Sequence, residues 1–172
     1  MHILLAIWLL YLNLKNQTWR SFPQFSRSII YVISFNGLYF FLCKDRLLWD
    51  FRSSYLKVKT VRRLQIFLIT PLFILLFLSK YPKNLYNRIL YICKWMGMSL
   101  LIESIALKRG AIIFKNGWNL NWSTIIYILM YVFSYLMSIK PLLTFTLSFA
   151  PTLFLLYHFQ IPLPLIKKFK LK

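Results

Sequence analysis

Long uncharged apolar runs alternate with short basic segments along the whole chain. Because unpaired backbone amides are too costly in hydrocarbon, runs of this length predict transmembrane helices. A run of about 16 to 19 residues forms a helix roughly 24 to 29 Å long, slightly under a typical hydrocarbon core. Flanking Lys, Arg, Trp and Tyr side chains can reach the headgroups and cover the difference. We expect an all-α integral membrane bundle of about six short helices over residues 1–14, 28–43, 64–79, 89–107, 122–139 and 142–159.

The first run, residues 1–14, is the least typical of the six. It is short enough to resemble the core of a signal peptide, but no Lys or Arg precedes it and no A-x-A cleavage pattern follows it. We expect a retained helix, and five spans instead of six if this segment lies at the membrane interface. The last two runs are separated only by residues 138–141, where Lys140 marks the membrane edge and Pro141 ends the preceding helix, which predicts a tight hairpin.

Lys and Arg are divided unequally between the two sets of alternate loops. One set holds 14 of these residues and the other holds 7. The first set comprises residues 44–63, 108–121 and 160–172, and the second comprises residues 15–27, 80–88 and Lys140. The positive-inside rule places the richer set in the cytoplasm. We therefore expect a multi-pass protein of the plasma membrane, a bacterial inner membrane, with cytoplasmic N- and C-termini and a basic cytoplasmic tail over 160–172.

Composition excludes two broad classes of protein. With 59% hydrophobic residues, a water-soluble domain of 172 residues would have too little polar surface to cover its core. The net charge of +19 does not indicate nucleic-acid binding, because the basic residues lie in short loops between spans instead of on one solvated face. The expected partners are the lipid bilayer and its anionic headgroups, which attract basic loops by about 1 kcal/mol per residue.

The basic segment 44–63 has two interpretations. Leu47, Leu48, Phe51 and Tyr55 recur at helical spacing, which favours an amphipathic helix lying in the membrane interface. A solvated basic linker explains so short a segment equally well.

Ionisable residues inside spans are costly and are therefore candidates for function. Lys94, Glu103 and His158 qualify, but Lys94 lies near a helix end and its stem can reach the headgroups. Glu103 is the only glutamate and lies about one turn from the end of its helix. A structural ion pair with the following loop, at Lys108 and Arg109, is the alternative interpretation of Glu103.

Topology brings further polar residues to the side of the membrane that Glu103 approaches. His158 lies one turn from the same side, and Asn116, Trp118 and Asn119 occupy the loop between the two helices. We expect these five residues to line one cytoplasm-facing cavity. The Asn116-Gly117 pair favours a tight turn, and Trp118 with Trp122 suits the headgroup layer, which allows a purely structural interpretation of the loop.

Within a span, Asn36 stands beside Gly37, a small polar pair that favours helix contact and an interhelical hydrogen bond. Pro71 and Pro151 lie near the centres of two helices of opposite direction, as in the inverted repeats of some transporters. Cys43 and Cys93 belong to no CxxC or Cys/His cluster, so the sequence predicts neither a disulfide nor a metal site. It also carries no catalytic or phosphate-binding motif, and we expect no cofactor.

Residues 107–119, which read LKRGAIIFKNGWN, are followed by Ser123 and by Lys-Pro-Leu at 140–142. With Glu103 and the order of spans, this pattern resembles an uncharacterised family of small multi-span membrane proteins from Bacillus- and Clostridium-like spore-forming bacteria. The resemblance implies a Gram-positive plasma membrane and carries no activity with it.

Three functions are compatible with the sequence. The leading hypothesis is a non-catalytic accessory component that binds another membrane protein, because no acid/base pair, nucleophile or metal cluster converges. The first alternative is a small transporter or channel-like protein with a polar site near Glu103, Asn36 and His158. The second is a membrane enzyme that acts on lipid headgroups at the cytoplasmic face.

Overall fold

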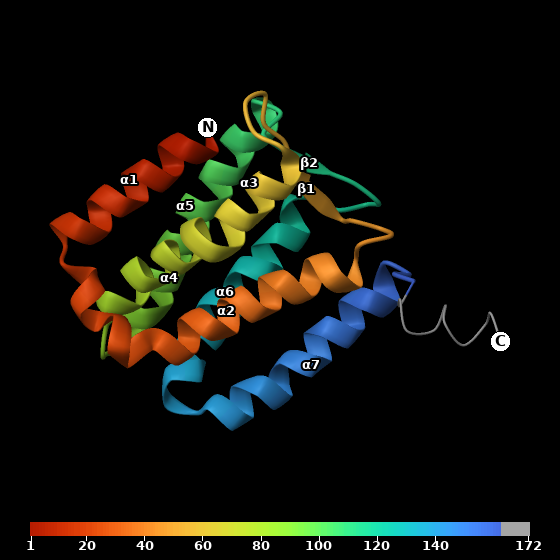
Figure 1. The fold of residues 1–172 in the computed structure, drawn as a ribbon. Coiled ribbons are helices and arrows are strands. Elements are labelled where there is room, and N and C mark those ends of the chain that lie inside the picture. Colours follow the sequence, from red (N-terminus) through yellow and green to blue (C-terminus); the bar gives the residue numbers. More distant parts are fainter. Residues whose placement is uncertain (163–172) are drawn as a thin grey trace.

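The computed structural model describes residues 1–162 and confirms the all-α fold. A short two-stranded sheet is added at one end of the helices (Figure 1). The helical elements are α1 (His2–Lys15), η1 (Thr18–Ser21), α2 (Phe22–Leu42), α3 (Val58–Leu64), η2 (Gln65–Ile69), α4 (Thr70–Ser79), α5 (Leu85–Lys108), α6 (Leu120–Ile139) and α7 (Pro141–His158). The strands are β1 (Trp49–Phe51) and β2 (Ile112–Phe114). The predicted basic tail, residues 160–172, falls outside the described residues from 163 onward.

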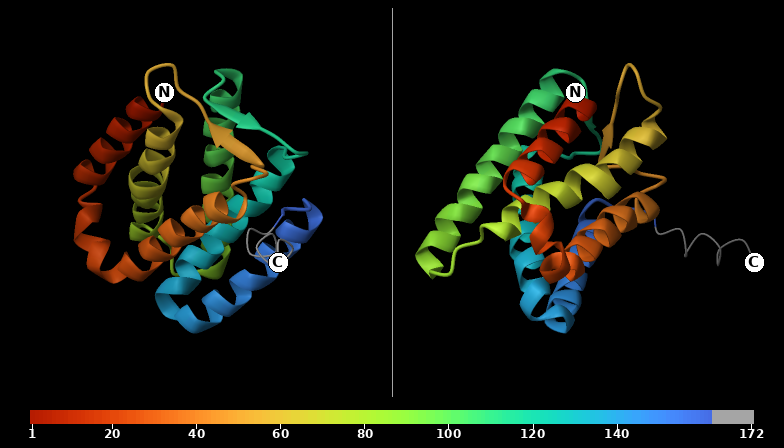
Figure 2. Two further views of the ribbon diagram at one scale, coloured as in Figure 1. Left: turned by 45° about the vertical axis from the view of Figure 1, so that its right-hand side comes forward. Right: turned by 60° about the vertical axis from the view of Figure 1, so that its left-hand side comes forward.

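Five helical segments are long and apolar enough to cross a membrane: Thr18–Leu42, Val58–Ser79, Leu85–Lys108, Leu120–Ile139 and Pro141–His158. The remaining helix, α1, has only 14 residues. It nevertheless packs along α4, because Leu9 is fully buried and the Asn13 side chain donates a hydrogen bond to the Leu72 carbonyl oxygen at 3.2 Å. The first helix is thus an integral part of the bundle, where it lies against η2 and α4 (Figure 2).

Large apolar side chains cover the outer faces of the bundle, and small polar side chains are buried among the apolar residues of its interior. Leu142 on α7 and Leu85 on α5 expose 85% and 71% of their surface, whereas Ser134 and Thr144 are completely buried. Small hydroxyl residues let helix backbones approach closely, and their hydroxyls bond back to carbonyl oxygens of their own helix.

The segment Val58–Ser79 is one continuous helix that changes its winding at η2, which is a π-helical turn. Pro71 follows this turn directly and is buried at the start of α4. A proline lacks the N–H group and would clash with the carbonyl oxygen four residues earlier, and a wider turn relieves that clash. The interruption therefore has a local cause in the sequence.

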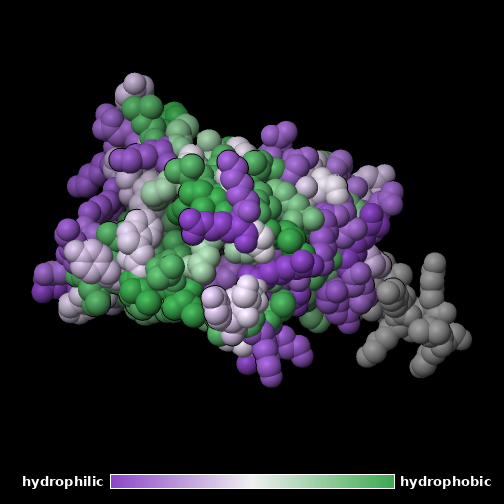
Figure 3. Space-filling model, turned by 90° about the horizontal axis from the view of Figure 1, so that it is seen from above, coloured by the Kyte–Doolittle hydropathy of each residue, from purple (hydrophilic) through white to green (hydrophobic). Residues whose placement is uncertain are grey.

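The loops before and after the strands meet at one end of the bundle. The His2 ring nitrogen Nε2 lies 3.0 Å from the Arg52 carbonyl oxygen, and the Asn116 side chain donates to the Leu47 carbonyl oxygen at 2.7 Å. At the opposite end, Lys80 donates to the Asn16 side chain. Viewed from the end that carries the strands, hydrophilic side chains surround a central hydrophobic area (Figure 3).

The structure of residues 44–63 contradicts the prediction of an interfacial amphipathic helix. Residues 49–51 form β1, which pairs antiparallel with β2 in the register Trp49 with Phe114 and Phe51 with Ile112. The partner strand comes from a loop about sixty residues later, so the local spacing of apolar residues does not reveal it. From Val58 onward the chain is helical, and α3 forms the first turns of the spanning helix Val58–Ser79.

Candidate ligand-binding site

The functional candidate Glu103 lies on a polar stripe between α5 and α6. Its carboxylate oxygen Oε1 accepts a hydrogen bond from the Ser123 hydroxyl at 3.1 Å, and the same hydroxyl accepts one from the Trp118 indole N–H at 3.0 Å. One helical turn away, the hydroxyls of Ser99 and Tyr131 form a second pair at 2.5 Å. Glu103 and Trp118, both predicted site residues, are therefore joined through Ser123.

The second oxygen of Glu103 has no partner. The residue exposes only 7% of its surface, yet Oε2 makes no hydrogen bond to any described residue. The Tyr127 hydroxyl faces the carboxyl group as a further donor. Lys108 and Arg109 are exposed, and within residues 1–162 Glu103 forms no ion pair with either. The alternative of a structural ion pair with this loop is wrong.

Glu103 lines a cavity of about 170 Å³ in the interior of the bundle. A buried water needs only about 10–15 Å³ of such space, so this cavity can hold several waters or a small ligand. Its polar lining residues come from four of the spans and comprise Asn36, Gln65, Thr70, Ser99, Glu103, Ser123 and Tyr127. Among the described residues, no Lys, Arg or His lines the cavity.

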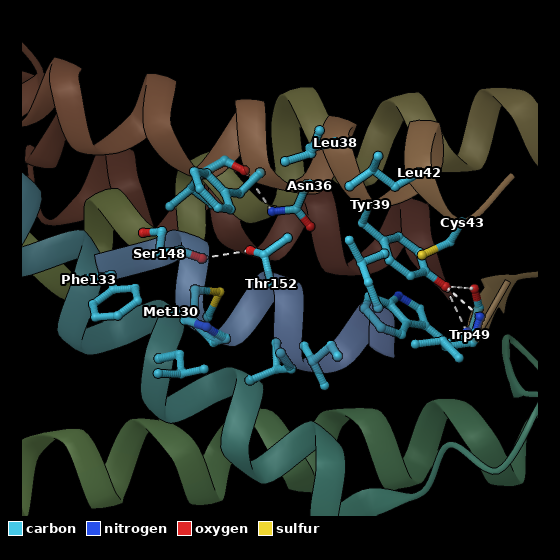
Figure 4. A pocket seen from close by; sticks show the side chains of 18 of the residues that line it. Asn36, Leu38, Tyr39, Leu42, Cys43, Trp49, Met130, Phe133, Ser148 and Thr152 are labelled. Atoms are coloured by element: carbon cyan, nitrogen blue, oxygen red, sulfur yellow. Dashed lines mark hydrogen bonds between the residues drawn. The ribbon is translucent and has the colours of Figure 1, made fainter. Parts of the chain in front are cut away.

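The strands cover the cavity at the end of the bundle. Trp49 and Phe51 of β1 and Ile112 of β2 all contribute to its wall. Trp49 is fixed by Tyr39, whose ring stacks on the indole with 3.7 Å between the ring centroids. The Tyr39 hydroxyl also accepts hydrogen bonds from the N–H groups of Leu48 and Trp49 and donates one to the Trp49 carbonyl oxygen (Figure 4).

Asn116 and Asn119 have structural roles in the loop after β2. Asn116 and Gly117 both have positive φ, at 52° and 85°, and the Trp118 N–H donates to the Lys115 carbonyl oxygen, so the predicted tight turn is present. Asn119 caps α6 by accepting hydrogen bonds from the N–H groups of Asn121 and Trp122. Neither residue lines the cavity that contains Glu103.

His158 lies apart from this cavity on the exposed surface of α7. Its ring packs against the rings of Trp122 and Phe154, with centroid distances of 4.7 and 5.8 Å. It does not line the cavity that contains Glu103. The structure therefore does not bring Glu103 and His158 together.

Trp118 and Asn36 occupy the interior. Trp118 exposes only 6% of its surface and contacts Trp49 and Phe159, so its side chain packs inside the protein. The Asn36 side chain donates to the Val32 carbonyl oxygen of its own helix at 2.8 Å. Its Oδ1 atom has no hydrogen-bond partner in the described part of the chain and is a second free acceptor at the cavity.

Sequence reasoning missed Ser99, Ser123, Tyr127 and Gln65. A signal for three of them is present: Ser99 and Glu103 are four residues apart, and so are Ser123 and Tyr127. Residues at this spacing share one helix face, so two facing polar stripes were visible in the sequence. Gln65 had no such signal, because it reaches the cavity at the π-helical turn and bonds the His2 ring at 3.0 Å.

The chemistry of the cavity is that of an acceptor site. It presents a carboxylate oxygen and an amide oxygen, with no positive side chain among the described residues that line it. A carboxylate that lacks a cationic partner attracts an ammonium ion. In comparisons with protein-family models, characterised proteins and solved structures, the chain matches none. The resemblance to the spore-former family therefore stays a prediction.

Proposed function

We propose that this chain is a multi-pass protein of a bacterial plasma membrane that binds an ammonium-bearing solute at Glu103, as a small transporter would. One observation carries the proposal: the only glutamate of a chain with 22 Lys and Arg residues is buried in a cavity with one oxygen unpartnered. Intramembrane carboxylates are costly, so a sequence rarely retains one without a function.

The burial of Glu103 explains why a cation is the fitting ligand. An ionised carboxylate away from water is strongly destabilising unless a positive group pairs with it. Within residues 1–162, Glu103 accepts a hydrogen bond from Ser123 and is faced by the Tyr127 hydroxyl, but no cationic side chain lines its cavity. A protonated amine supplies the missing charge and donates to Glu103 Oε2, and Asn36 Oδ1 in the same cavity is a further acceptor; neither oxygen has a hydrogen-bond partner in the described part of the chain.

This proposal takes precedence over the accessory role that the sequence alone favours. An accessory protein that binds partners through its outer faces has no need of an interior acceptor cavity. An enzyme acting on headgroups is less compatible with the site, because no second carboxylate and no His, Lys or Cys among the described residues lines the cavity beside Glu103.

Replacing Glu103 with Gln tests the proposal directly. The amide keeps the shape and the Ser123 hydrogen bond but removes the charge, so the affinity for propylammonium should fall by about tenfold, equivalent to roughly 1.4 kcal/mol. Calorimetric titration of the purified protein in lipid nanodiscs measures it. Lys94→Gln is the matched control, since it changes one charge on an exposed part of the same helix and should leave affinity unchanged. Equal affinity of Glu103→Gln and wild type, or tight binding of propionate, would refute the proposal.

The proposed orientation predicts opposite labelling of two loops. In a chain with Cys43→Ala and Cys93→Ala, we expect Lys83→Cys to react with a membrane-impermeant maleimide added to intact cells. Tyr55→Cys, which lies at the opposite end and is 92% exposed in the native chain, should react only after the membrane is opened. The reverse pattern would place the termini outside and overturn the orientation.

A further inference from the structure

A second cavity of about 190 Å³ adjoins the first between α2, α6 and α7. Its wall consists mainly of apolar residues, including Leu38, Leu42, Met130 and Phe133 (Figure 4). An apolar cavity of roughly 150 Å³ already binds a molecule such as benzene. The space is therefore large enough for part of a hydrocarbon ligand.

The hydroxyl groups in this second cavity are already bonded within the protein. Tyr31 pairs with Ser148 at 2.6 Å, Thr152 donates to the Ser148 carbonyl oxygen, and Tyr39 is bonded to the backbone of the strand loop. A polar solute would find few free partners here. What the wall offers is apolar surface, which suits a hydrocarbon chain.

The two cavities share part of their walls. Five residues line both of them: Asn36, Trp49, Trp118, Ile126 and Met130. Asn36 stands on this partition with its free Oδ1, and the flexible Met130 side chain adapts readily to a ligand. Apolar space therefore begins on the other side of these side chains, and a ligand that extends into it from Glu103 has to displace the Met130 side chain.

We propose that the ligand is a single-chain amphiphile, with an ammonium head at Glu103 and a hydrocarbon tail in the cavity between α2, α6 and α7. This inference rests on the proposed function for the head and adds the tail. Leu38 lies at the wall and exposes 36% of its surface, so the tail cavity extends toward the lipid-facing side of α2. Such a ligand reaches the site from the bilayer.

A photoreactive dodecylamine with a diazirine near the tail end tests where the tail lies. The probe is added to the full chain in nanodiscs, irradiated, and the labelled residues are mapped by mass spectrometry. We expect labelling of the segments of α6 and α7 around Leu129, Thr152 and Leu155. An excess of dodecylamine should suppress it about tenfold, whereas dodecanoate, with the same tail and an anionic head, should not.

Two variants of α7 separate tail binding from general effects on the helix. Thr152→Phe fills the tail cavity and should reduce the labelling about tenfold, while the affinity for propylammonium stays unchanged. Thr146→Phe is the matched control, because Thr146 is exposed on the same helix, lines neither cavity, and should leave the labelling unchanged.

The outcomes distinguish the two proposals. Propylammonium binding that depends on Glu103, combined with labelling only of residues facing the lipid, would overturn the tail assignment and leave the head site standing. Labelling that dodecanoate suppresses as well as dodecylamine would overturn the amphiphilic cation. If propylammonium does not bind the wild-type protein, the proposed function itself fails.

Discussion

Replacing Tyr39 with Phe should lower the free energy of unfolding by about 2–4 kcal/mol. The substitution removes one hydroxyl that accepts hydrogen bonds from two backbone N–H groups, at 3.0 Å from Leu48 and 2.8 Å from Trp49. Leu48 is 2% exposed, so its N–H has little access to water, and each unsatisfied donor costs about 1–3 kcal/mol. The Phe ring keeps the stacking on Trp49, which isolates the contribution of the hydroxyl.

Titration with SDS in mixed micelles, followed by tryptophan fluorescence, measures this loss. Tyr157→Phe is the matched control, since Tyr157 lies on α7 with 87% of its surface exposed, and its stability should equal that of wild type. Because Trp49 lines both cavities, the Tyr39 variant should also bind propylammonium less tightly. Unchanged stability would show that the hydroxyl does not hold the strand loop.

The second large effect is expected at Arg62, which anchors β1 to α3. Its guanidinium donates two hydrogen bonds to the Asp50 carboxylate, at 2.9 and 2.7 Å, and lies over the Phe40 ring. Arg62→Met leaves that carboxylate without its cation. Loss of a buried pair costs about 3–5 kcal/mol, but the Arg62 side chain is 29% exposed, so we expect about 2 kcal/mol. Arg63→Met, at the exposed neighbouring position, should cost little.

The Asp50–Arg62 pair also predicts a dependence of stability on pH. Burial alone would raise the pKa of the Asp50 carboxyl, but the hydrogen bonds from Arg62 and from the Phe51 N–H, together with nearby positive charge, lower that pKa below its ordinary value. A carboxyl with a lowered pKa stabilises the fold above its unfolded pKa, and this contribution disappears as pH falls through the folded pKa.

We therefore expect the stability advantage of wild type over Arg62→Met to be full at neutral pH. It should shrink on acidification below about pH 4, where the carboxyl begins to take up a proton. SDS titrations at a series of pH values measure this difference. A gap between the two proteins that stays constant down to the lowest pH would contradict the assignment of Asp50 as the charged partner.

Both variants act on the structure that closes the ligand cavities. Tyr39 and Arg62 belong to different spans, yet both hold β1 in place. The strand in turn carries Trp49, which lines both cavities. The stability of this end of the bundle and the integrity of the candidate site are therefore coupled.

The sequence by itself determined the elements that the bilayer dictates. Apolar runs bounded by basic residues predict spanning helices, since hydrocarbon leaves the backbone no other stable conformation. The Lys140-Pro141 hairpin and the Asn116-Gly117 turn followed from local chemistry alone. Glu103 was also identifiable as a candidate, because a carboxylate within an apolar span is costly and therefore rare.

Only the tertiary structure decided which residues surround Glu103. Trp118 turned inward to bond Ser123, His158 stayed on the outer surface, and residues 49–51 became a strand. The inward position of Trp118 also depends on its contact with the distant Trp49, and the strand depends on pairing with residues 112–114; pairings between distant segments leave no local periodicity. The hydrocarbon requires each span to be helical, but packing against the other helices decides which side of each helix faces the interior. That rotation determined that one oxygen of Glu103 faces a cavity instead of a cation.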